Sequence, residues 1–235
     1  MFNSIKYKLL LTHFILIVIV IGGLGIKQSS QQLEFAESQT IIYHKNISQK
    51  FITQISAALA GNNYGKIYLP VFNEELKNTS TLNYLEVEGI SDSDHIYQIA
   101  YQKDIGKTWR KKFPSNFKEN LENKIKKFNN LLKNQQSDSI KLNFLLDRSY
   151  NQLAKHQQSI EYIKTTKDLY DDITFKLGVT IDKNKWTMEL VLPTINENGG
   201  ASKFVYDISD LKTIKENILK NTAMFVLNVE NSLPS

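Results

Sequence analysis

The histidines and carboxylates, which most often carry catalysis, are spread too thinly in this chain to form a reactive set. His44, His95 and His156 fall on three different predicted elements, and none has a second ligand at metal-binding spacing. Asp92 and Asp94 precede His95, but the glycine and glutamate of a calcium loop are missing, which favours turn chemistry. The sequence therefore predicts no enzyme, no cofactor and no metal centre.

Aromatic side chains on or beside the predicted strands are the more promising feature. A small-molecule pocket over a sheet uses amphipathic rings, together with a cation or a carboxylate that orients the ligand. Ordinary sheet packing is the alternative for each ring taken singly. The residues that we expect to bind a ligand are Tyr97, Tyr101, Trp109, Arg110, Trp186, Tyr206 and Asp207.

Residues 9–26, from Leu9 to Ile26, form an apolar run that is long enough to cross a bilayer. As a helix, about 18 residues rise roughly 27 Å, close to the thickness of a hydrocarbon core. Lys6 and Lys8 precede the run, so the N-terminus should stay in the cytoplasm and the remainder should lie outside. A cleaved signal peptide is the alternative, but its apolar region is usually shorter.

Composition limits the cellular compartment and the classes of binding partner that we expect. The 235 residues include no cysteine, and an exported domain without disulfides fits a bacterial periplasm. We therefore expect a single-pass protein of the bacterial inner membrane. The hydrophobic content of 41% is enough for a buried core. Lys107, Arg110, Lys111 and Lys112 form the densest basic run, which suits an anionic ligand, lipid head groups or a solvated surface. Nucleic acid is not an expected partner, since no arginine-rich patch with aromatics occurs.

Helical periodicity marks four segments. Ile47, Phe51, Ile55 and Leu59 step by four along a predicted stalk helix over residues 27–61. A second helix opens at Pro114, where Asn116 and Glu119 resemble a capping box, and its apolar stripe is Phe117, Leu121, Ile125, Phe128 and Leu132. A third helix is predicted over residues 139–171. Ser209 begins the fourth.

Alternation of apolar and polar residues predicts five strands. Residues 84–88 and 96–101 form a hairpin candidate. Three further runs, 173–181, 186–192 and 204–208, are separated by short turns, which is typical of an antiparallel meander. The sequence thus predicts an α+β fold with a five-stranded antiparallel sheet and flanking helices. The expected parts are a cytoplasmic tail (1–8), a transmembrane helix (9–26), a stalk helix (27–61), one folded domain (62–208) and an exit helix with a tail (209–235).

Both ends of the chain resemble one family of bacterial receptors. Residues 3–12 look like a short basic leader that runs straight into a first membrane helix. Residues 190–193 and 199–211 look like the close of a Cache domain, where a paired strand leads through an aspartate-rich turn into an exit helix. The order of elements is similar to that of the extracytoplasmic PAS-like sensors of the Cache family. These sensors occur in chemoreceptors, sensor histidine kinases and diguanylate cyclases.

The resemblance implies a membrane-anchored signal-input domain. Such a domain would bind a small molecule and relay a helix shift within a homodimer or to a signalling partner. Family members normally continue through a second membrane helix into an output module, whereas the apolar run 223–227 is too short to span a bilayer. We therefore expect either a lost or truncated output module or a solitary sensor that acts through a partner. The aromatic–Arg–aromatic pattern of the amino-acid-binding subgroup is also missing; Trp109 and Arg110 after Tyr101 come nearest. The alternative function is a bitopic assembly protein of a pilus, secretion or division complex.

Overall fold

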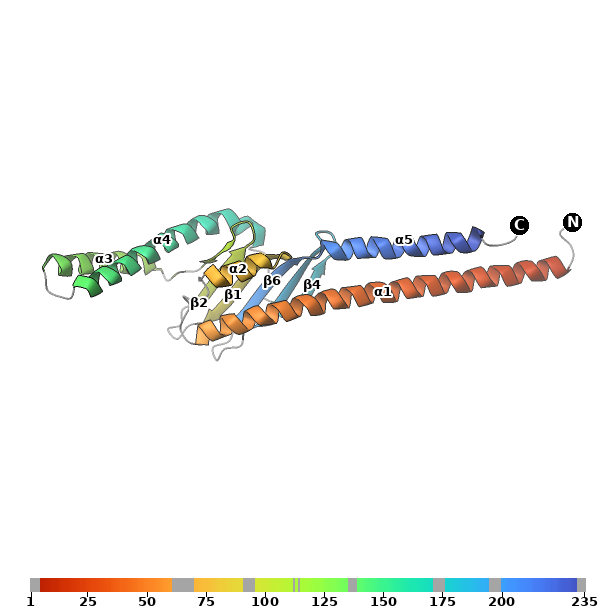
Figure 1. The fold of residues 1–235 in the computed structure, drawn as a ribbon, viewed down its shortest axis with the longest axis horizontal. Helices are drawn as coiled ribbons and strands as arrows, with labels where there is room; N and C mark the ends of the chain where they lie inside the picture. Colours follow the sequence, from red (N-terminus) through yellow and green to blue (C-terminus); the bar gives the residue numbers. More distant parts are fainter. Residues whose placement is uncertain are drawn as a thin grey trace. The chain divides into compact units, whose positions relative to one another are not determined.

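The computed structural model describes residues 5–60, 70–90, 96–111, 113, 115–134, 139–170, 176–194 and 200–231. This part of the chain has an α+β fold, in which helices flank a six-stranded antiparallel sheet (Figure 1). The helices are α1 (Ile5–Ala60), α2 (Pro70–Asn78), α3 (Phe117–Lys133), α4 (Ser139–Tyr170) and α5 (Ser209–Asn231). The strands are β1 (Leu82–Ile90), β2 (Ile96–Gln102), β3 (Lys107–Arg110), β4 (Gly178–Asp182), β5 (Thr187–Pro193) and β6 (Gly200–Asp207).

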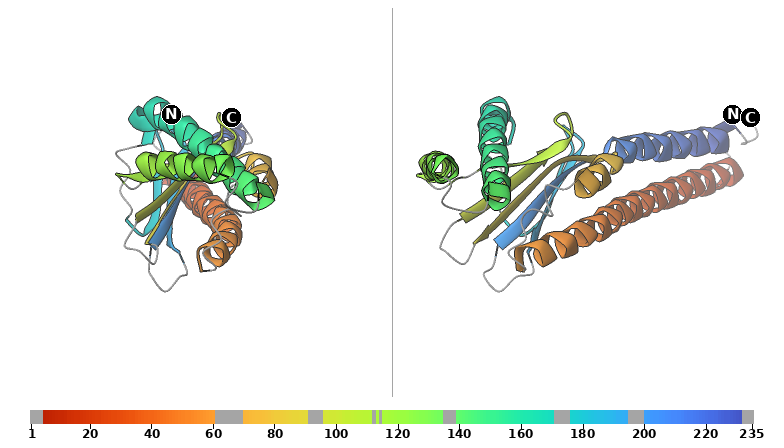
Figure 2. Two further views of the ribbon diagram at one scale, coloured as in Figure 1. Left: turned by 90° about the vertical axis from the view of Figure 1, so that its left-hand side faces the viewer. Right: turned by 60° about the vertical axis from the view of Figure 1, so that its left-hand side comes forward.

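The sheet has the order β3-β2-β1-β6-β5-β4, so the first and last strands of the chain are neighbours at its centre (Figures 1 and 2). β1 pairs antiparallel with β2 on one side and with β6 on the other. The predicted count of five strands is one too low. The additional strand is β3, which falls in the basic run and is only four residues long. Four residues are too few for a clear alternation of apolar and polar residues, and β3 is instead stabilised by pairing with β2.

Two local predictions also differ from the structure. Asn116 does precede α3, but its side chain makes no capping hydrogen bond, since its φ of −99° and ψ of 12° lie outside the extended region that an N-cap residue uses. Trp186, predicted to begin a strand, has a φ of 52° and lies in the turn before β5. The start of the predicted strand 173–181 lies outside the described residues, and β4 begins at Gly178.

The chain divides into two compact units, which α1 joins as one continuous helix. The first unit consists of residues 1–46, 182–187 and 208–235. Within it, the Ser29 hydroxyl hydrogen-bonds to the Thr222 hydroxyl, and Lys183 pairs with Glu37 at 3.0 Å. The second unit consists of residues 47–181 and 188–207, which include most of the sheet and helices α2, α3 and α4.

Among the described residues, one helix is long and apolar enough to cross a membrane. It is α1, whose best window has a mean hydropathy of 2.6 and is not buried within the protein. The large apolar side chains of residues 9–26 are mostly exposed, Leu10 and Leu16 among them. By length and composition, the predicted span therefore fits the first part of α1.

The last turns of α1 pack on one face of the sheet. Phe51 is 2% exposed, and its ring lies 5.9 Å from the ring of Phe72 in α2 and 6.5 Å from that of Phe204 in β6. Ile55, one turn further along, is also buried. The four-residue stripe predicted for this helix is thus confirmed at both positions.

Gly106 in the turn between β2 and β3 carries the first prediction. Its φ of 65° is left-handed, and its N–H donates to the Gln102 carbonyl at 2.9 Å. Gly106→Ala should lower the free energy of unfolding by about 1–2 kcal/mol, because a Cβ is unfavourable in this region. Chemical denaturation of the full chain measures the loss.

A steric contribution can be separated from the backbone strain. The added Cβ would lie 2.9 Å from Cε of Lys77, which is the movable end of a long side chain. We therefore expect Gly106→Ala to lower the free energy of unfolding by the same amount in the Lys77→Ala background as in the native chain. Full recovery would show that crowding, and not the backbone, is responsible.

Candidate ligand site on the sheet

One row of side chains crosses the sheet on the face that carries Trp109. Trp109 of β3 lies opposite Ala100 of β2, which lies opposite Glu86 of β1. Glu86 in turn lies opposite Lys203 of β6. Directly opposed residues on neighbouring strands share a face of the sheet. The row therefore places an indole, a methyl group, a carboxylate and an amine side by side.

An ion pair surrounded by buried groups occupies the centre of this row. The Tyr84 hydroxyl donates to Oε2 of Glu86 at 2.5 Å, and Nζ of Lys111 donates to the same oxygen at 3.1 Å. Lys111 also contacts the Tyr84 hydroxyl at 3.3 Å. Side-chain exposure is 16% for Lys111 and 5% for Glu86. We call Tyr84, Glu86, Lys111 and Lys203 the Glu86 cluster.

Lys203 is the most unusual member of the Glu86 cluster, since its exposed fraction is 0%. Burial lowers the pKa of its amine, while the carboxylates of Glu189 and Glu86 raise it and Lys111 lowers it again. Buried lysines are rare in proteins unless a partner compensates the lost hydration. The protonation of Lys203 therefore depends on the negative charge that surrounds it.

Two polar atoms near the row are buried without a hydrogen-bond partner in the described part of the chain. They are Nε1 of Trp109 and Oε1 of Gln102. Trp109 is 2% exposed, and its ring meets Tyr162 of α4 edge-on at 5.5 Å. An unsatisfied buried donor costs about 1–3 kcal/mol, and such a group needs an explanation such as a bound water or ligand.

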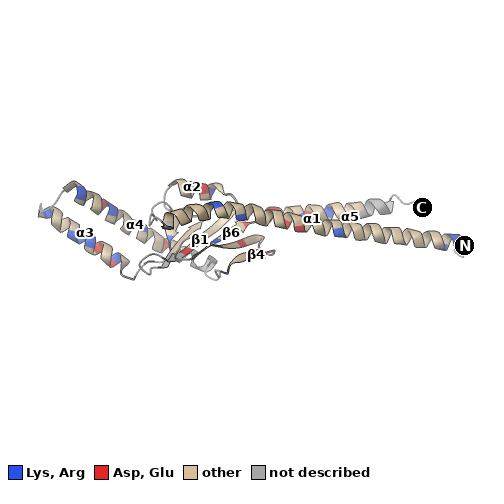
Figure 3. Cartoon of the chain, turned by 90° about the horizontal axis from the view of Figure 1, so that it is seen from below, with Lys and Arg blue, Asp and Glu red and all other residues tan. Residues whose placement is uncertain are grey.

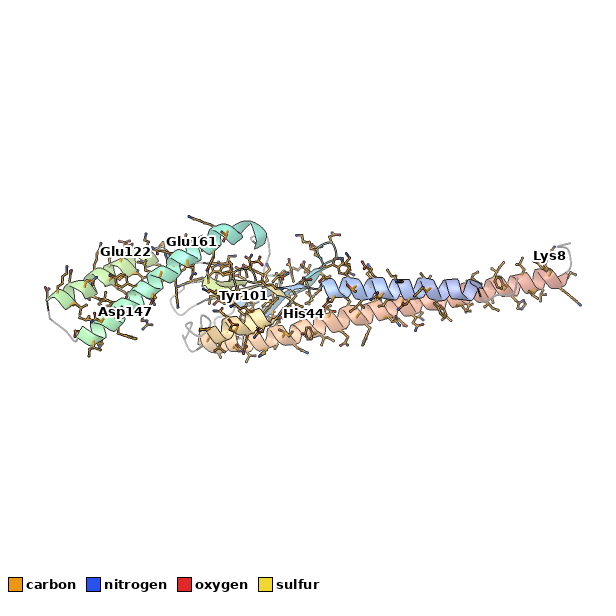
Figure 4. The ribbon with its side chains drawn as sticks, turned by 45° about the horizontal axis from the view of Figure 1, so that its top comes forward. Lys8, His44, Tyr101, Glu122, Asp147 and Glu161 are labelled. Carbon is orange, nitrogen blue, oxygen red and sulfur yellow. The ribbon has the colours of Figure 1, made fainter. Side chains whose placement is uncertain are left out.

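Two of the ligand-binding residues predicted from sequence lie on the opposite face. Tyr101 is opposite Leu85 and Thr108 in register, and Figure 4 shows it within the sheet. Burial, with Glu74 as the second cause, raises the pKa of its phenol. The Tyr206 hydroxyl hydrogen-bonds to the Ser48 hydroxyl of α1 at 2.7 Å. These two tyrosines belong to the α1 side of the sheet, away from the row.

The other predicted residues are also dispersed. The Arg110 guanidinium stacks over the rings of Phe113 and Phe117, at 5.1 and 5.6 Å. Trp186 belongs to the first unit, where Lys215 lies 5.8 Å from its ring. Asp207 is the last residue of β6, and its N–H donates to the Thr81 carbonyl. Tyr97 lies near the start of β2, and its side chain is outside the described residues. Of the seven, the row contains Trp109.

Sequence reasoning missed the charged residues of the row. Lys203 stands within the strand 200–207, directly before Phe204, and a lysine flanked by buried strand residues is a usable signal. Lys111 belongs to the basic run for which a solvated surface is one of the alternatives predicted from sequence. In the structure its side chain is half-buried and forms an ion pair with Glu86. Elsewhere, lysines and arginines alternate with acids along α3 and α4, as Figure 3 shows.

Metal-ligand clusters are not found in the described residues: no group of three or more His, Asp or Glu side chains could hold an ion. Asp92, Asp94 and His95 lie outside this part of the chain. His44 is buried in α1, and its Nδ1 lies 2.8 Å from the Thr40 carbonyl oxygen. Burial is the main cause that lowers its pKa.

His156 of α4 carries the second prediction. Its ring lies 4.5 Å from Phe113 and 5.5 Å from Phe117, the two rings over which Arg110 stacks. Burial lowers the pKa of His156, and the positive charge of Lys118 lowers it further. Between about pH 6.5, its unfolded pKa, and the lower folded value, the unfolded chain binds more protons, so stability falls as pH falls through this window.

The measurement compares melting temperatures at pH 7.5 and 5.5 for the native chain and for His156→Gln. The native chain should lose more on acidification, because the variant lacks the titrating ring. His44 is common to both proteins and cancels in the comparison. Equal losses would mean that His156 does not set the acid sensitivity.

Comparisons with known proteins do not place this chain in a family. No family model, no curated protein and no solved structure matches it.

Proposed function

We propose that the chain is a membrane-anchored, extracytoplasmic ligand-sensing domain of Cache or PAS-like form. In this proposal a small molecule binds at the sheet face that carries the row from Trp109 to Lys203. The observation that supports it most is the burial of an amine, a carboxylate and an unpartnered indole N–H in one register row. Binding sites combine apolar walls with a few convergent polar groups of this kind.

The arrangement of the sheet supports the PAS-like part of the proposal. In PAS-like domains the first and last strands lie side by side at the centre of an antiparallel sheet. Here β1 and β6 have these positions, and β3 is an additional edge strand. Buried polar groups without a hydrogen-bond partner are few in native proteins and need an explanation, and a bound ligand is one such explanation, which is why we propose a sensor before an assembly protein.

Chain connectivity offers a route for the signal. β6 carries Lys203 and leads through Ile208 into α5, so a displacement of β6 acts directly on the exit helix. On the other face, Phe51 couples the sheet to α1, which continues without a break to the apolar segment. A ligand shifts these helices only if it binds one helix arrangement more tightly than the other.

A thermal-shift screen of the full chain in detergent micelles tests the proposed function. The compounds are organic acids, amino acids, amines and sugars, each at several concentrations. A ligand at 100 times its dissociation constant adds about 2.7 kcal/mol to the stability, so its effect should be clear and saturable. The exposed-site variant Glu122→Gln should respond as the native chain does. A folded protein that responds to no compound class would contradict sensing and favour a bitopic assembly protein.

A further inference from the structure

We propose that α5 makes a second membrane contact, in which residues 222–225 lie at the outer boundary of the bilayer beside α1. We call these four residues the Phe225 turn. The partner is the phospholipid itself, with acyl chains around the apolar side chains and phosphate groups at the neighbouring lysines. The inference rests on the membrane anchor of the proposed function, and it adds a segment that is too short to span a bilayer by itself.

The Phe225 turn packs on α1 at the end of the predicted span. A Cβ placed on Gly25 would lie 3.9 Å from a ring carbon of Phe225 and 3.9 Å from the methyl carbon of Thr222. The Thr222 hydroxyl also hydrogen-bonds to the hydroxyl of Ser29, one turn further along α1. All of these residues belong to the first unit, and Figure 1 shows α5 alongside α1. These contacts fix which level of α5 lies beside which level of α1.

Charged residues disappear from both helices at this same level. On α1 the apolar run ends before Lys27, two residues after Gly25. On α5 the charge-free run begins after Lys220, two residues before Thr222. The two helices are antiparallel, so both lysines lie on the same side of the contact. A boundary between water and hydrocarbon explains why the two changes coincide, since lysines at such a boundary extend their ammonium groups toward the lipid phosphates.

Large apolar side chains are exposed on both helices where the charges end. Met224 is 47% exposed and Phe225 is 52% exposed. On α1, Leu24 and Ile26 are 61% and 68% exposed. A single exposed apolar residue is ordinary on a soluble surface. Four of them at the level where a predicted span meets the surface are accounted for by lipid contact.

The polar groups inside the contact have partners, as an environment with little water requires. Ser29 is 7% exposed, and its hydroxyl oxygen lies 2.9 Å from the Gly25 carbonyl oxygen. The Thr222 hydroxyl oxygen lies 2.8 Å from the Ile218 carbonyl oxygen. Each hydroxyl therefore has an acceptor in its own helix in addition to the hydroxyl of the other helix. Serine and threonine hydroxyls often bridge neighbouring helices in this way within membranes.

The next charged residue of α5 limits the depth of the contact. Glu230 follows Phe225 by five residues, about 7.5 Å along the helix. A carboxylate is costly near the centre of a bilayer. The proposal therefore places the Phe225 turn level with Gly25, where the apolar run of α1 ends, and no deeper.

Spin labelling of single cysteines measures the surroundings of the Phe225 turn. The chain contains no cysteine, so Phe225→Cys creates one labelling site in the full chain, which is reconstituted into vesicles of phosphatidylcholine and phosphatidylglycerol. Collisions of the nitroxide with oxygen report lipid, and collisions with a water-soluble nickel chelate report water. We expect the ratio of oxygen to nickel collisions to be roughly fivefold higher for Phe225→Cys than for Ile214→Cys, because oxygen is apolar and the chelate stays hydrated.

Ile214→Cys is the matched control, since Ile214 is 42% exposed on the same helix. Eleven residues separate it from Phe225, which is about three turns or roughly 16 Å, so both lie on the same side of α5. Leu16→Cys, at a residue that is 60% exposed within the predicted span, gives the reference value for lipid. If circular dichroism shows that Phe225→Cys does not fold, Met224→Cys takes its place.

The outcomes separate this inference from the anchor on which it rests. Equal ratios for Phe225→Cys and Ile214→Cys, with Leu16→Cys in lipid, would place the Phe225 turn in water and overturn the inference. Few collisions of Phe225→Cys with either reagent would mean that protein covers it, such as a second copy of the chain, and would overturn it as well. In both cases the membrane anchor stands. If Leu16→Cys collides mainly with the nickel chelate, the anchor itself is wrong and both proposals fail.

Discussion

Glu86→Leu should lower the free energy of unfolding by about 3–5 kcal/mol, the usual cost of removing one partner of a buried ion pair. The variant deletes the carboxylate that accepts from Tyr84 and Lys111 and that lies opposite Lys203. The Lys111 side chain is 16% exposed and keeps part of its hydration, whereas Lys203 is fully buried and has no contact with solvent. Most of the loss should therefore come from Lys203, which is left buried with less negative charge around it.

A double variant separates this cause from a loss of packing. Glu86→Leu/Lys203→Met removes both charges and should recover most of the lost stability, since apolar replacements of buried ion pairs are often neutral or stabilising. The matched control is Glu122→Gln, which removes the exposed pair of Lys118 and Glu122 on α3 and should cost at most about 0.5 kcal/mol. Urea denaturation of the four proteins gives the comparison. If the double variant is no more stable than Glu86→Leu, charge burial is not the cause.

Phe51→Ala should have an effect of similar size, about 3–5 kcal/mol, because truncation of a buried phenylalanine leaves a cavity. The ring is 2% exposed and packs against Phe72 and Phe204. The variant thus tests whether the last turns of α1 belong to the core of the second unit. Denaturation of the full chain, followed by circular dichroism, measures the loss.

Phe35→Ala is the matched control, since Phe35 lies in the same helix and is 65% exposed. We expect its stability to change by less than about 0.5 kcal/mol, as for other surface substitutions. Equal effects of the two substitutions would contradict the placement of Phe51 in the core.

Local periodicity predicted much of the fold. Stepping by four marked α1 and α3, where Phe51, Ile55, Leu121 and Ile125 are buried. Alternation indicated β5 and β6, although not their limits. These patterns are visible because each depends on residues that are close in the chain. The capping box predicted at Asn116 does not form, because the backbone at that residue does not adopt the conformation that an N-cap residue requires.

The candidate site depends on contacts that are distant in the chain. Glu86 and Lys203 are brought together only by the register of β1 with β6. Trp109 joins them through β3, a strand too short to show a period. Sequence reasoning identified Trp109 as an aromatic residue beside the predicted strands, but it chose Arg110 and Asp207 as the charged groups of the site. Without the pairing of the strands, the sequence does not show that Lys203 lies opposite Glu86.

Transport across the membrane is the premise on which the sensor proposal depends, and single-cysteine labelling tests it most directly. The chain contains no cysteine, so Lys6→Cys and Lys185→Cys each create one labelling site, at the basic leader and in an exposed turn. A membrane-impermeant maleimide is applied to bacterial spheroplasts before and after lysis. We predict that Lys185→Cys is labelled in intact spheroplasts and that Lys6→Cys is labelled only after lysis. Labelling of Lys185→Cys only after lysis would place the sheet in the cytoplasm and contradict the account.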